Sequence, residues 1–250
     1  MYSNKENINI LTSLLLEWGV TDAVVCPGSR NAAIVHNLNE CGTIRCHPIT
    51  DERSAAFYAM GIALNTKRPT VVCVTSGSAL LNTAPAVAEA YYQHVPLIVI
   101  AADRPQQWID QLDGQTLPQP DALNRFVRRS VSLPEPHTEE ERWYCNRLVN
   151  EALHAATFRQ PAPVLINVPI TEPLFTFDVA ELPKERRFRM LDSEAALTNT
   201  TVEVLQQELY QAKRPLIVVG QMAADSFGCS VFEINRSEER RVGKECRSRW

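Results

Sequence analysis

The chain has 250 residues, of which 45% are hydrophobic and 22% are charged, and its formal net charge is −4 at pH 7. This composition predicts a globular protein with one large or two modest cores, and the charge gives no reason to expect nucleic acid or an anionic membrane as a partner. Seven scattered cysteines without CxxC spacing, and an N-terminus without an apolar leader, favour a cytoplasmic protein that lacks disulfides, a membrane span and a zinc site.

Short apolar runs alternate with helical stretches along the first 170 residues. The expected helices are 8–18, a stretch ending at 38, one beginning near 52, 79–92 and 138–159, and the expected strands are 23–26, 44–47, 70–75, 97–102, 126–133 and 164–168. Most of these strands are continuous apolar runs, as in a parallel sheet that helices cover on both faces. The sequence therefore predicts the α/β fold class.

The same pattern divides the chain into segments. Residues 1–170 form one α/β domain, and the proline-rich and charged stretch 171–199 is interpreted as a linker. Residues 200–234 are typical of the start of a second α/β domain, with a helix at 202–212 and a strand at 215–220. The basic stretch 235–250 predicts a disordered tail, or foreign sequence fused to a truncated reading frame. Residues 106–120 lack periodicity, so we expect a functional or mobile segment there.

Polar groups follow four of the expected strands at the point where each strand ends. These groups are Ser29–Arg30, Glu52, Ser76–Ser78 and Asp103–Arg104. Each has a structural explanation as well, because a glutamate favours a helix start, serines cap helices and arginines are readily solvated. Parallel strands present their carboxyl ends at one edge of the sheet, so the joint occurrence of these groups favours a ligand site there.

Familiar signatures of other sites are missing from the 250 residues. No GxGxxG, GxxxxGK[ST] or GxSxG occurs, and the five histidines lack metal-ligand spacing. What remains is a pocket with one carboxylate and two guanidinium groups, and paired arginines suit a substrate with several carboxylates. A glutamate in such a pocket can share a proton with a heterocyclic nitrogen.

Four motifs together resemble the pyrimidine-binding domain of thiamine-diphosphate enzymes. They are CPGSR at 26–30, DER at 51–53 before a helix rich in Ala and Gly, TSGSA at 75–79, and ADRP at 102–105 with Gln115 beyond it. Within that class they are most similar to the 2-succinyl-5-enolpyruvyl-6-hydroxy-3-cyclohexene-1-carboxylate synthases of menaquinone biosynthesis. The resemblance extends over about residues 7–232, which in that family are the first domain and the start of the middle domain.

The resemblance implies roles for these residues. The glutamate that matches Glu52 is catalytic in the family, because it hydrogen-bonds N1′ of the aminopyrimidine ring of thiamine diphosphate. The cofactor-binding positions that it implies are Glu52, Pro27, Ser76 and Ser78. The substrate-binding positions that it implies are Ser29, Arg30, Arg104 and Gln115. The implied substrates are 2-oxoglutarate and isochorismate. Gly114 departs from the pattern, since many members of the family carry Asn beside the glutamine.

The resemblance also implies groups outside this sequence. The family binds the diphosphate and Mg²⁺ through a GDG motif in a C-terminal domain, and the 250 residues contain no GDG. Its sites form between subunits of a homodimer or homotetramer, so we expect no metal ligands in this chain and an inactive fragment when it is isolated. Two alternatives stay open: another thiamine-diphosphate enzyme, such as an acetolactate synthase or a 2-oxo acid decarboxylase, and a non-catalytic α/β module that binds anions.

Overall fold

The computed structural model describes residues 1–191 and 196–214. The chain divides into two compact units, Met1–Met190 and Leu191–Trp250. The first unit contains every strand that the sequence predicts before residue 170. The expected strand at 215–220 and the tail at 235–250 lie outside the described residues.

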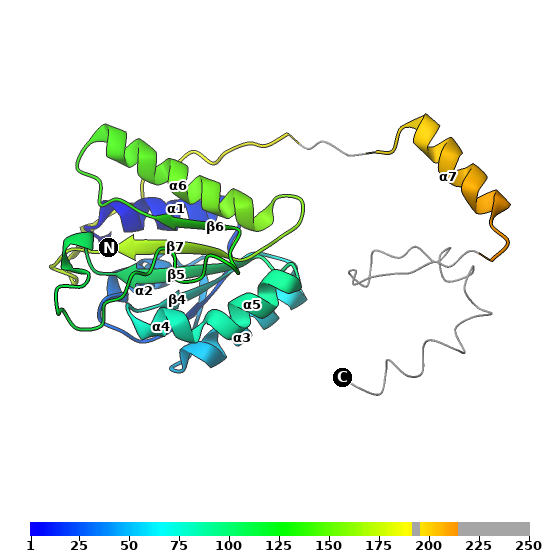
Figure 1. Cartoon of the computed structure of the whole chain (residues 1–250). Coiled ribbons are helices and arrows are strands. Elements are labelled where there is room, and N and C mark those ends of the chain that lie inside the picture. Colours follow the sequence, from blue (N-terminus) through cyan, green and yellow to red (C-terminus); the bar gives the residue numbers. More distant parts are fainter. Residues whose placement is uncertain (192–195, 215–250) are drawn as a thin grey trace. The chain divides into compact units, whose positions relative to one another are not determined.

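A six-stranded parallel sheet forms the centre of the first unit (Figure 1). The strand order is β3-β2-β4-β5-β7-β6, and every neighbouring pair runs parallel. The strands are β2 Asp22–Val25, β3 Arg45–Pro48, β4 Thr70–Val74, β5 Leu97–Asp103, β6 Arg129–Ser132 and β7 Val164–Pro169. The central strands β4 and β5 are buried along their whole length. This arrangement confirms the predicted α/β fold class.

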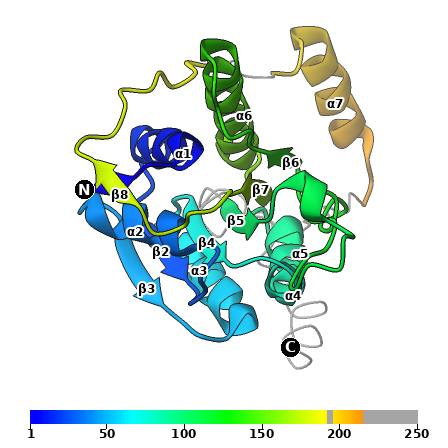
Figure 2. The ribbon, with the colours of Figure 1, turned by 90° about the vertical axis from the view of Figure 1, so that its left-hand side faces the viewer.

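Helices cover both faces of the sheet (Figure 1 and Figure 2). One face carries α1 Glu6–Glu17, α2 Ala32–Glu40 and α6 Glu139–Thr157, and the other carries α3 Glu52–Thr66, α4 Ser78–Asn82 and α5 Ala84–Tyr92. Successive residues of a strand point to opposite faces, so Val71 joins one hydrophobic core and Val72 joins the other. Burying one such side chain contributes about 1.5–3 kcal/mol. Two cores on one sheet therefore explain why these strands show no polar alternation.

Local sequence signals set where the helices begin. Asp51 caps α3, because its carboxylate accepts hydrogen bonds from the backbone N–H groups of Arg53 and Ser54. Thr138 and Glu141 form a capping box at the start of α6. Because Asp51 holds the cap position, Glu52 is the first residue of α3.

The single helix expected at 79–92 is instead two helices, α4 and α5, with Thr83 between them. Pro85 lies in the first turn of α5 and has no N–H to donate, so it cannot continue the ladder from the preceding turn. The hydroxyl of Thr83 donates to the carbonyl of Leu80 at 2.7 Å instead. The apolar pattern at 79–92 does not reveal this break, because both helices bury the same face.

The segment interpreted as a linker is attached to the first unit over much of its length. Its strand β8 (Phe177–Val179) pairs antiparallel with β1 (Tyr2–Ser3), and Pro183 accepts a hydrogen bond from the Ser13 hydroxyl at 2.7 Å. Glu185 forms an ion pair with Arg142 of α6 at 2.8 Å. The first unit consequently reaches Met190. Polar contacts of this kind leave no hydrophobic periodicity in the sequence.

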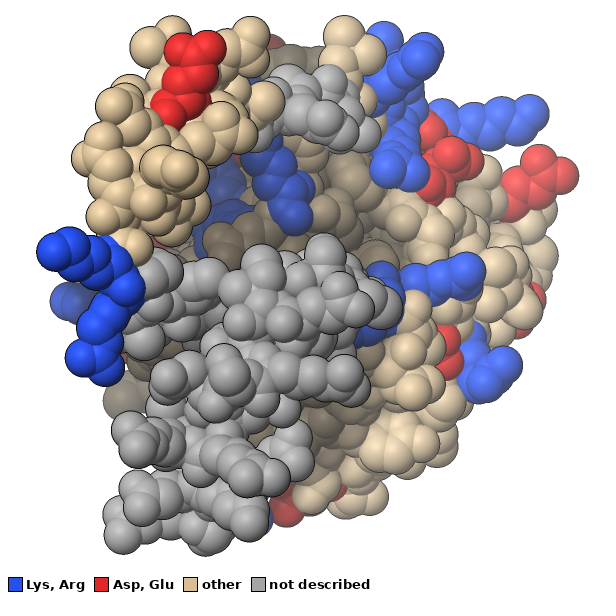
Figure 3. Space-filling view, turned by 90° about the vertical axis from the view of Figure 1, so that its right-hand side faces the viewer, with Lys and Arg blue, Asp and Glu red and all other residues tan. Residues whose placement is uncertain are grey.

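The second unit is described only for residues 196–214 and contains α7, Asn199–Gln211, which matches the expected helix at 202–212. The side chain of Thr198 caps this helix. None of the helices in the described residues has the length and apolar content to cross a membrane. In the space-filling view of Figure 3, Lys and Arg side chains lie next to Asp and Glu side chains in several places.

A buried polar network fixes the carboxyl end of the sheet. Gln119 is fully buried, its side-chain carbonyl accepts from the N–H of Gly77 at 2.6 Å, and its amide donates to the carbonyl of Ala102 at 3.1 Å and to Asn167 at 2.7 Å. Asn167 in turn donates to Asp103 at 2.9 Å. Buried amides are costly unless every group is paired. The network therefore ties the turn after β4 to the ends of β5 and β7.

We expect Gln119→Ala to destabilise the protein by about 1–3 kcal/mol, because it leaves the Gly77 N–H and the Oδ1 atom of Asn167 without these partners in a buried site. Urea unfolding followed by circular dichroism measures the change. Gln107→Ala, which truncates an exposed glutamine of the neighbouring segment, is the matched control and should stay within about 0.5 kcal/mol. Equal unfolding midpoints for the two variants would contradict a stabilising role for the network.

Candidate functional site

Glu52 lies at the carboxyl edge of the sheet, directly after β3. The strand arrows of Figure 1 point to this edge, which faces the viewer in Figure 2. The side chain is half-buried, and within the described residues its one hydrogen bond comes from Asn82 of α4, at 3.3 Å. Burial, together with the negative charge of Glu52, raises the pKa of the Cys26 thiol to about 12. Glu52 therefore lies close to the end of β2, as its place at a strand end predicts.

The turn after β2 passes very close to the end of β4. A Cβ atom on Gly28 would lie 2.5 Å from Cβ of Thr75 and 2.7 Å from Oδ1 of Asn31, so only glycine fits there. Pro27 and Ser29 are exposed on this turn. Ser29 does not cap α2, because the N-cap position is held by Asn31. The side chain of Asn31 makes no capping hydrogen bond.

Asn31 carries an unusual buried atom. Its amide nitrogen donates to the carbonyl of Cys26 at 2.8 Å, which fixes the turn, but its Oδ1 is buried without a hydrogen-bond partner in the described part of the chain. A buried acceptor without a donor costs free energy. This oxygen is therefore an unpaired acceptor inside the closely packed turn after β2.

Arg30 is the buried arginine of the site. Its side chain is 8% exposed, one terminal nitrogen donates to the carbonyl of Ile170 at 3.0 Å, and the other lies 3.4 Å from the Glu172 carboxylate. Burial, and after it the charge of Arg104, lowers the pKa of Arg30, while Glu172 acts in the opposite direction. Two guanidinium groups that repel each other in a partly buried site favour an anion near both of them.

Arg104 follows β5 and lines one cavity together with Arg30. Its Nε donates to the carbonyl of Gly114 at 3.1 Å and forms an ion pair with Asp113 at 3.0 Å. The cavity has a volume of about 550 Å³, and its charged lining residues are Arg30, Arg104, Asp113 and Glu172. Each arginine therefore has one carboxylate from this chain beside it and keeps further donors for a ligand.

Gln115, from the segment after β5, packs against the turn after β4. Its side-chain amide donates to the carbonyl of Ser76 at 3.0 Å. Gly77 has a positive φ of 79°, and a Cβ on it would lie 2.9 Å from Cγ of Gln115, so this turn needs glycine for two reasons. Ser76 is buried, whereas Ser78 is exposed as the first residue of α4.

The structure thus brings the candidate residues to one edge of the sheet in three groups. The groups are Glu52 with Asn82, Arg30 with Arg104, and Ser76 with Gln115. No hydrogen bond or ion pair joins Glu52 to either arginine in the described residues. Sequence reasoning missed Asn82, Asp113, Gln119, Asn167 and Glu172. Of these, Asn167 had a usable signal, because it is a polar residue in the middle of the apolar strand β7.

A second cavity of about 760 Å³ adjoins the first, and Arg104, Pro105 and Thr171 line both. The carboxylate of Asp103 lies in its wall, and burial raises the pKa of that carboxyl although Asn167 and the N–H of Arg104 both donate to it. Within residues 1–191 and 196–214, no group of three or more His, Cys, Asp or Glu side chains is placed to hold a metal ion.

The chain is similar to known proteins over most of its length. Residues 8–124 match the family model described as thiamine pyrophosphate enzyme, N-terminal TPP binding domain. Two similar curated proteins are the 2-succinyl-5-enolpyruvyl-6-hydroxy-3-cyclohexene-1-carboxylate synthases of Bacteroides thetaiotaomicron, 53% identical over 225 residues, and of Phocaeicola vulgatus, 51% identical over 222 residues. The same-named protein of Porphyromonas gingivalis is 38% identical over 220 residues.

The matches cover 89% of this chain and 40% of the length of the first two relatives, and 88% and 38% for the third. The chain therefore spans about two fifths of the curated relatives that it matches. Both the resemblance read from the four motifs and the predicted fold class are confirmed. The chain is similar, over about two fifths of their length, to the 2-succinyl-5-enolpyruvyl-6-hydroxy-3-cyclohexene-1-carboxylate synthases, and it belongs to the thiamine pyrophosphate enzymes, whose N-terminal TPP binding domain it carries.

Proposed function

We propose that this chain supplies the pyrimidine-binding half of the active site of a thiamine-diphosphate-dependent synthase of menaquinone biosynthesis. The overall reaction decarboxylates 2-oxoglutarate and adds the resulting four-carbon unit to isochorismate. The observation that carries the proposal is the position of Glu52, a half-buried carboxylate with one long hydrogen bond, at the same sheet edge as a cavity lined by two arginines.

The residues around Glu52 fit an aminopyrimidine ring. A carboxylate with a single 3.3 Å hydrogen bond from Asn82 keeps acceptor capacity for a ring nitrogen. The turn of Pro27 and Ser29 is exposed, and Gly28 lets it approach Thr75 closely. The turn of Ser76 and Ser78 borders α4, which carries Asn82.

Thiamine diphosphate, when bound, supplies a nucleophilic carbon that adds to a 2-oxo acid and accepts the electron pair left by decarboxylation. Glu52 would share a proton with N1′ of the pyrimidine through its carboxylate. Asn82 keeps the carboxylate in one orientation through its amide. In this proposal Glu52 is the catalytic residue of the chain.

Arg30 and Arg104 bind carboxylates of the substrates, with Ser29 and Gln115 as neutral hydrogen-bonding partners. 2-Oxoglutarate and isochorismate each carry two carboxylates, and a guanidinium group pairs with a carboxylate through two parallel hydrogen bonds. The mutual repulsion of the two arginines is relieved when a dianion occupies their cavity of about 550 Å³. A substrate with one carboxylate uses this pair less well.

The diphosphate and Mg²⁺ belong, in this proposal, to residues outside these 250, since the sequence contains no GDG motif. The full site then forms between subunits of a cytoplasmic homodimer or homotetramer. The surface beside Glu52 supports such an assembly, because Phe57, Tyr58 and Leu81 are about half-exposed there. Large apolar side chains gathered on one surface are typical of interfaces.

Isolated residues 1–250 are expected to bind thiamine diphosphate and Mg²⁺ at least about 100-fold more weakly than the full-length protein. This difference corresponds to a loss of about 2.7 kcal/mol or more of binding free energy in the isolated residues. Titration calorimetry measures both, and chelation of Mg²⁺ should abolish binding by the full-length protein. The full-length protein should consume 2-oxoglutarate and isochorismate together. Turnover of pyruvate alone would assign it to the acetolactate synthase type, and no cofactor binding by the full-length protein would leave only a non-catalytic module.

Glu52→Gln in the full-length protein should slow exchange of the C2 proton of the bound cofactor by about 10²–10⁴-fold, because the amide cannot hold the proton at N1′. Proton NMR after rapid quenching measures the exchange rate, and urea unfolding shows whether the variant is folded. The control is Glu89→Gln, the same change at an exposed residue of α5. Normal exchange in folded Glu52→Gln would refute the role of this carboxylate.

Phe57→Asp should shift the full-length protein toward monomer, because a buried carboxylate opposes an apolar interface. Light scattering coupled to gel filtration measures the mass. Phe175→Asp makes the same change at a phenylalanine that is exposed but lies outside α3, and it should leave the mass unaltered. An unchanged mass for both variants would show that the α3 surface is not the subunit interface.

A further inference from the structure

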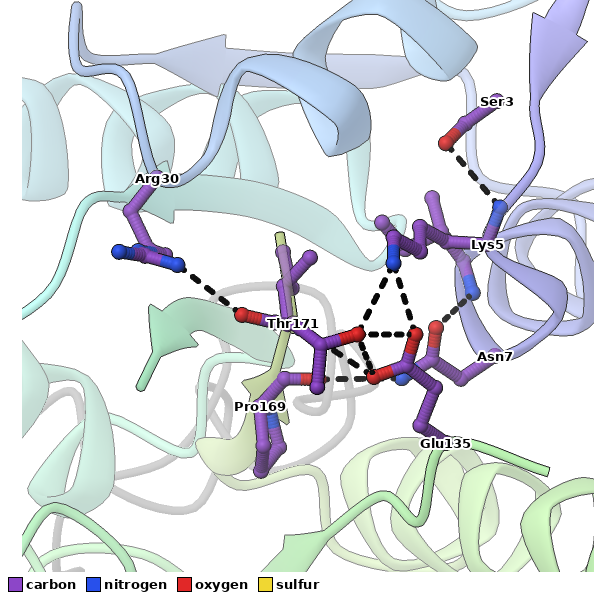
Figure 4. A network of polar contacts seen from close by, with 9 residues as sticks. Ser3, Lys5, Asn7, Arg30, Glu135, Pro169 and Thr171 are labelled. Carbon is purple, nitrogen blue, oxygen red and sulfur yellow. Dashed lines mark hydrogen bonds and ion pairs between the residues drawn. The ribbon is translucent and has the colours of Figure 1, made fainter. Parts of the chain in front are cut away.

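The three residues that follow β7 hold the guanidinium group of Arg30. The carbonyl of Ile170 accepts from one nitrogen of Arg30 at 3.0 Å, and the carboxylate of Glu172 lies 3.4 Å from the other. Figure 4 shows Arg30 directed at the chain beside Thr171. Since the Arg30 side chain is 8% exposed, its direction depends on these contacts rather than on water. The position of the segment 170–172 therefore sets where Arg30 points.

Thr171, in the middle of that segment, is held by Glu135 from the coil between β6 and α6. The N–H of Thr171 donates to one carboxylate oxygen of Glu135 at 3.2 Å, and the hydroxyl of Thr171 lies 2.7 and 2.6 Å from the two oxygens. Figure 4 shows both side chains directed at each other. One carboxylate thus fixes both the backbone and the side chain of this residue.

Lys5 completes the group from the N-terminal end of the chain. Its ammonium group lies 2.9 Å from Glu135 and 3.0 Å from the hydroxyl of Thr171, and its side chain is 8% exposed (Figure 4). Asn7, two residues further on, donates to the carbonyl of Pro169 at 3.2 Å. Residues far apart in the sequence therefore meet on one short segment beside Arg30.

This ion pair is partly buried, since Glu135 is 18% exposed. Burial alone would raise the pKa of Glu135, but hydrogen bonds from Thr171 and Lys5 outweigh it and hold the pKa below its ordinary value. A buried ion pair is weak evidence for a purely stabilising role, because apolar residues of similar volume stabilise as well or better. Its location beside Thr171, which lines both cavities, indicates another purpose.

We propose that Lys5 and Glu135 are positioning residues for substrate binding: they clamp Thr171, and through the segment 170–172 they hold Arg30 in the orientation that receives a substrate carboxylate. Glu135 lines the larger cavity, and in this role it acts through Thr171. The inference rests on the proposed function of Arg30 as a carboxylate-binding residue. It assigns a role to two residues that no motif in the sequence singles out.

The test uses Glu135→Gln and Thr171→Val in the full-length protein, with Glu181→Gln as an exposed control for the same chemical change. Glu135→Gln keeps the shape of the side chain but loses one acceptor and the negative charge. Thr171→Val keeps the Lys5–Glu135 ion pair and removes only the hydroxyl, so it decides the question if Glu135→Gln does not fold. Both should raise the KM of at least one of the two dicarboxylate substrates about tenfold, while kcat stays within about twofold, since one misplaced charged hydrogen bond corresponds to about that factor.

A second readout does not depend on activity. Phenylglyoxal modifies accessible arginines, and mass spectrometry of the peptide that contains Arg30 gives its modification rate relative to exposed Arg53. We expect slow modification of Arg30 in the unaltered protein and at least about fivefold faster modification in both variants, because a released side chain becomes accessible. Glu181→Gln should leave both rates unchanged.

The outcomes separate the inference from the function on which it rests. A higher KM together with faster modification of Arg30 supports the clamp. Faster modification with an unchanged KM overturns the role of Arg30 in substrate binding, and with it the proposed function of this site, while the clamp itself stands. Unchanged modification and unchanged KM in folded Thr171→Val overturn the clamp.

Discussion

Parallel pairing of the strands is the constraint on which the rest of this molecule depends. Because all six strands of the main sheet run in one direction, their carboxyl ends meet at a single edge, and every turn after a strand delivers its residues there. Glu52, Arg30, Ser76 and Arg104 come from four such turns. An antiparallel sheet built from the same strands would distribute them over two edges.

The turns at this edge are held by buried polar networks rather than by apolar packing. Gln119 and Asn167 connect the turn after β4 to the ends of β5 and β7, and Lys5 and Glu135 connect the N-terminal segment to the chain after β7. A network of this kind specifies one geometry, because any alternative leaves a buried donor or acceptor unpaired. That property suits a site in which side chains must be held in fixed directions.

Charge is arranged locally in a chain whose net charge is −4. Two arginines share one cavity, and each is accompanied by a carboxylate, Glu172 for Arg30 and Asp113 for Arg104. A site that binds anions can therefore exist without a basic surface around it, since low solvent exposure strengthens charge interactions over a few ångströms. This explains why overall composition was a poor guide to the ligand.

The sequence by itself determined the α/β class, the place of nearly every strand and helix, and the edge at which polar residues gather. These features depend on short-range signals, namely apolar runs and helical spacing, which a reader of the sequence can count. The sequence did not predict the break between α4 and α5 or the attachment of residues 171–190 to the first unit, because neither feature changes the hydrophobic pattern. Only the tertiary structure decided which polar groups touch: Asn82 on Glu52, Glu172 and Asp113 on the arginines, and Lys5 with Glu135 on Thr171. Contacts between residues 130 or more positions apart follow from how the layers pack, and no local pattern records them.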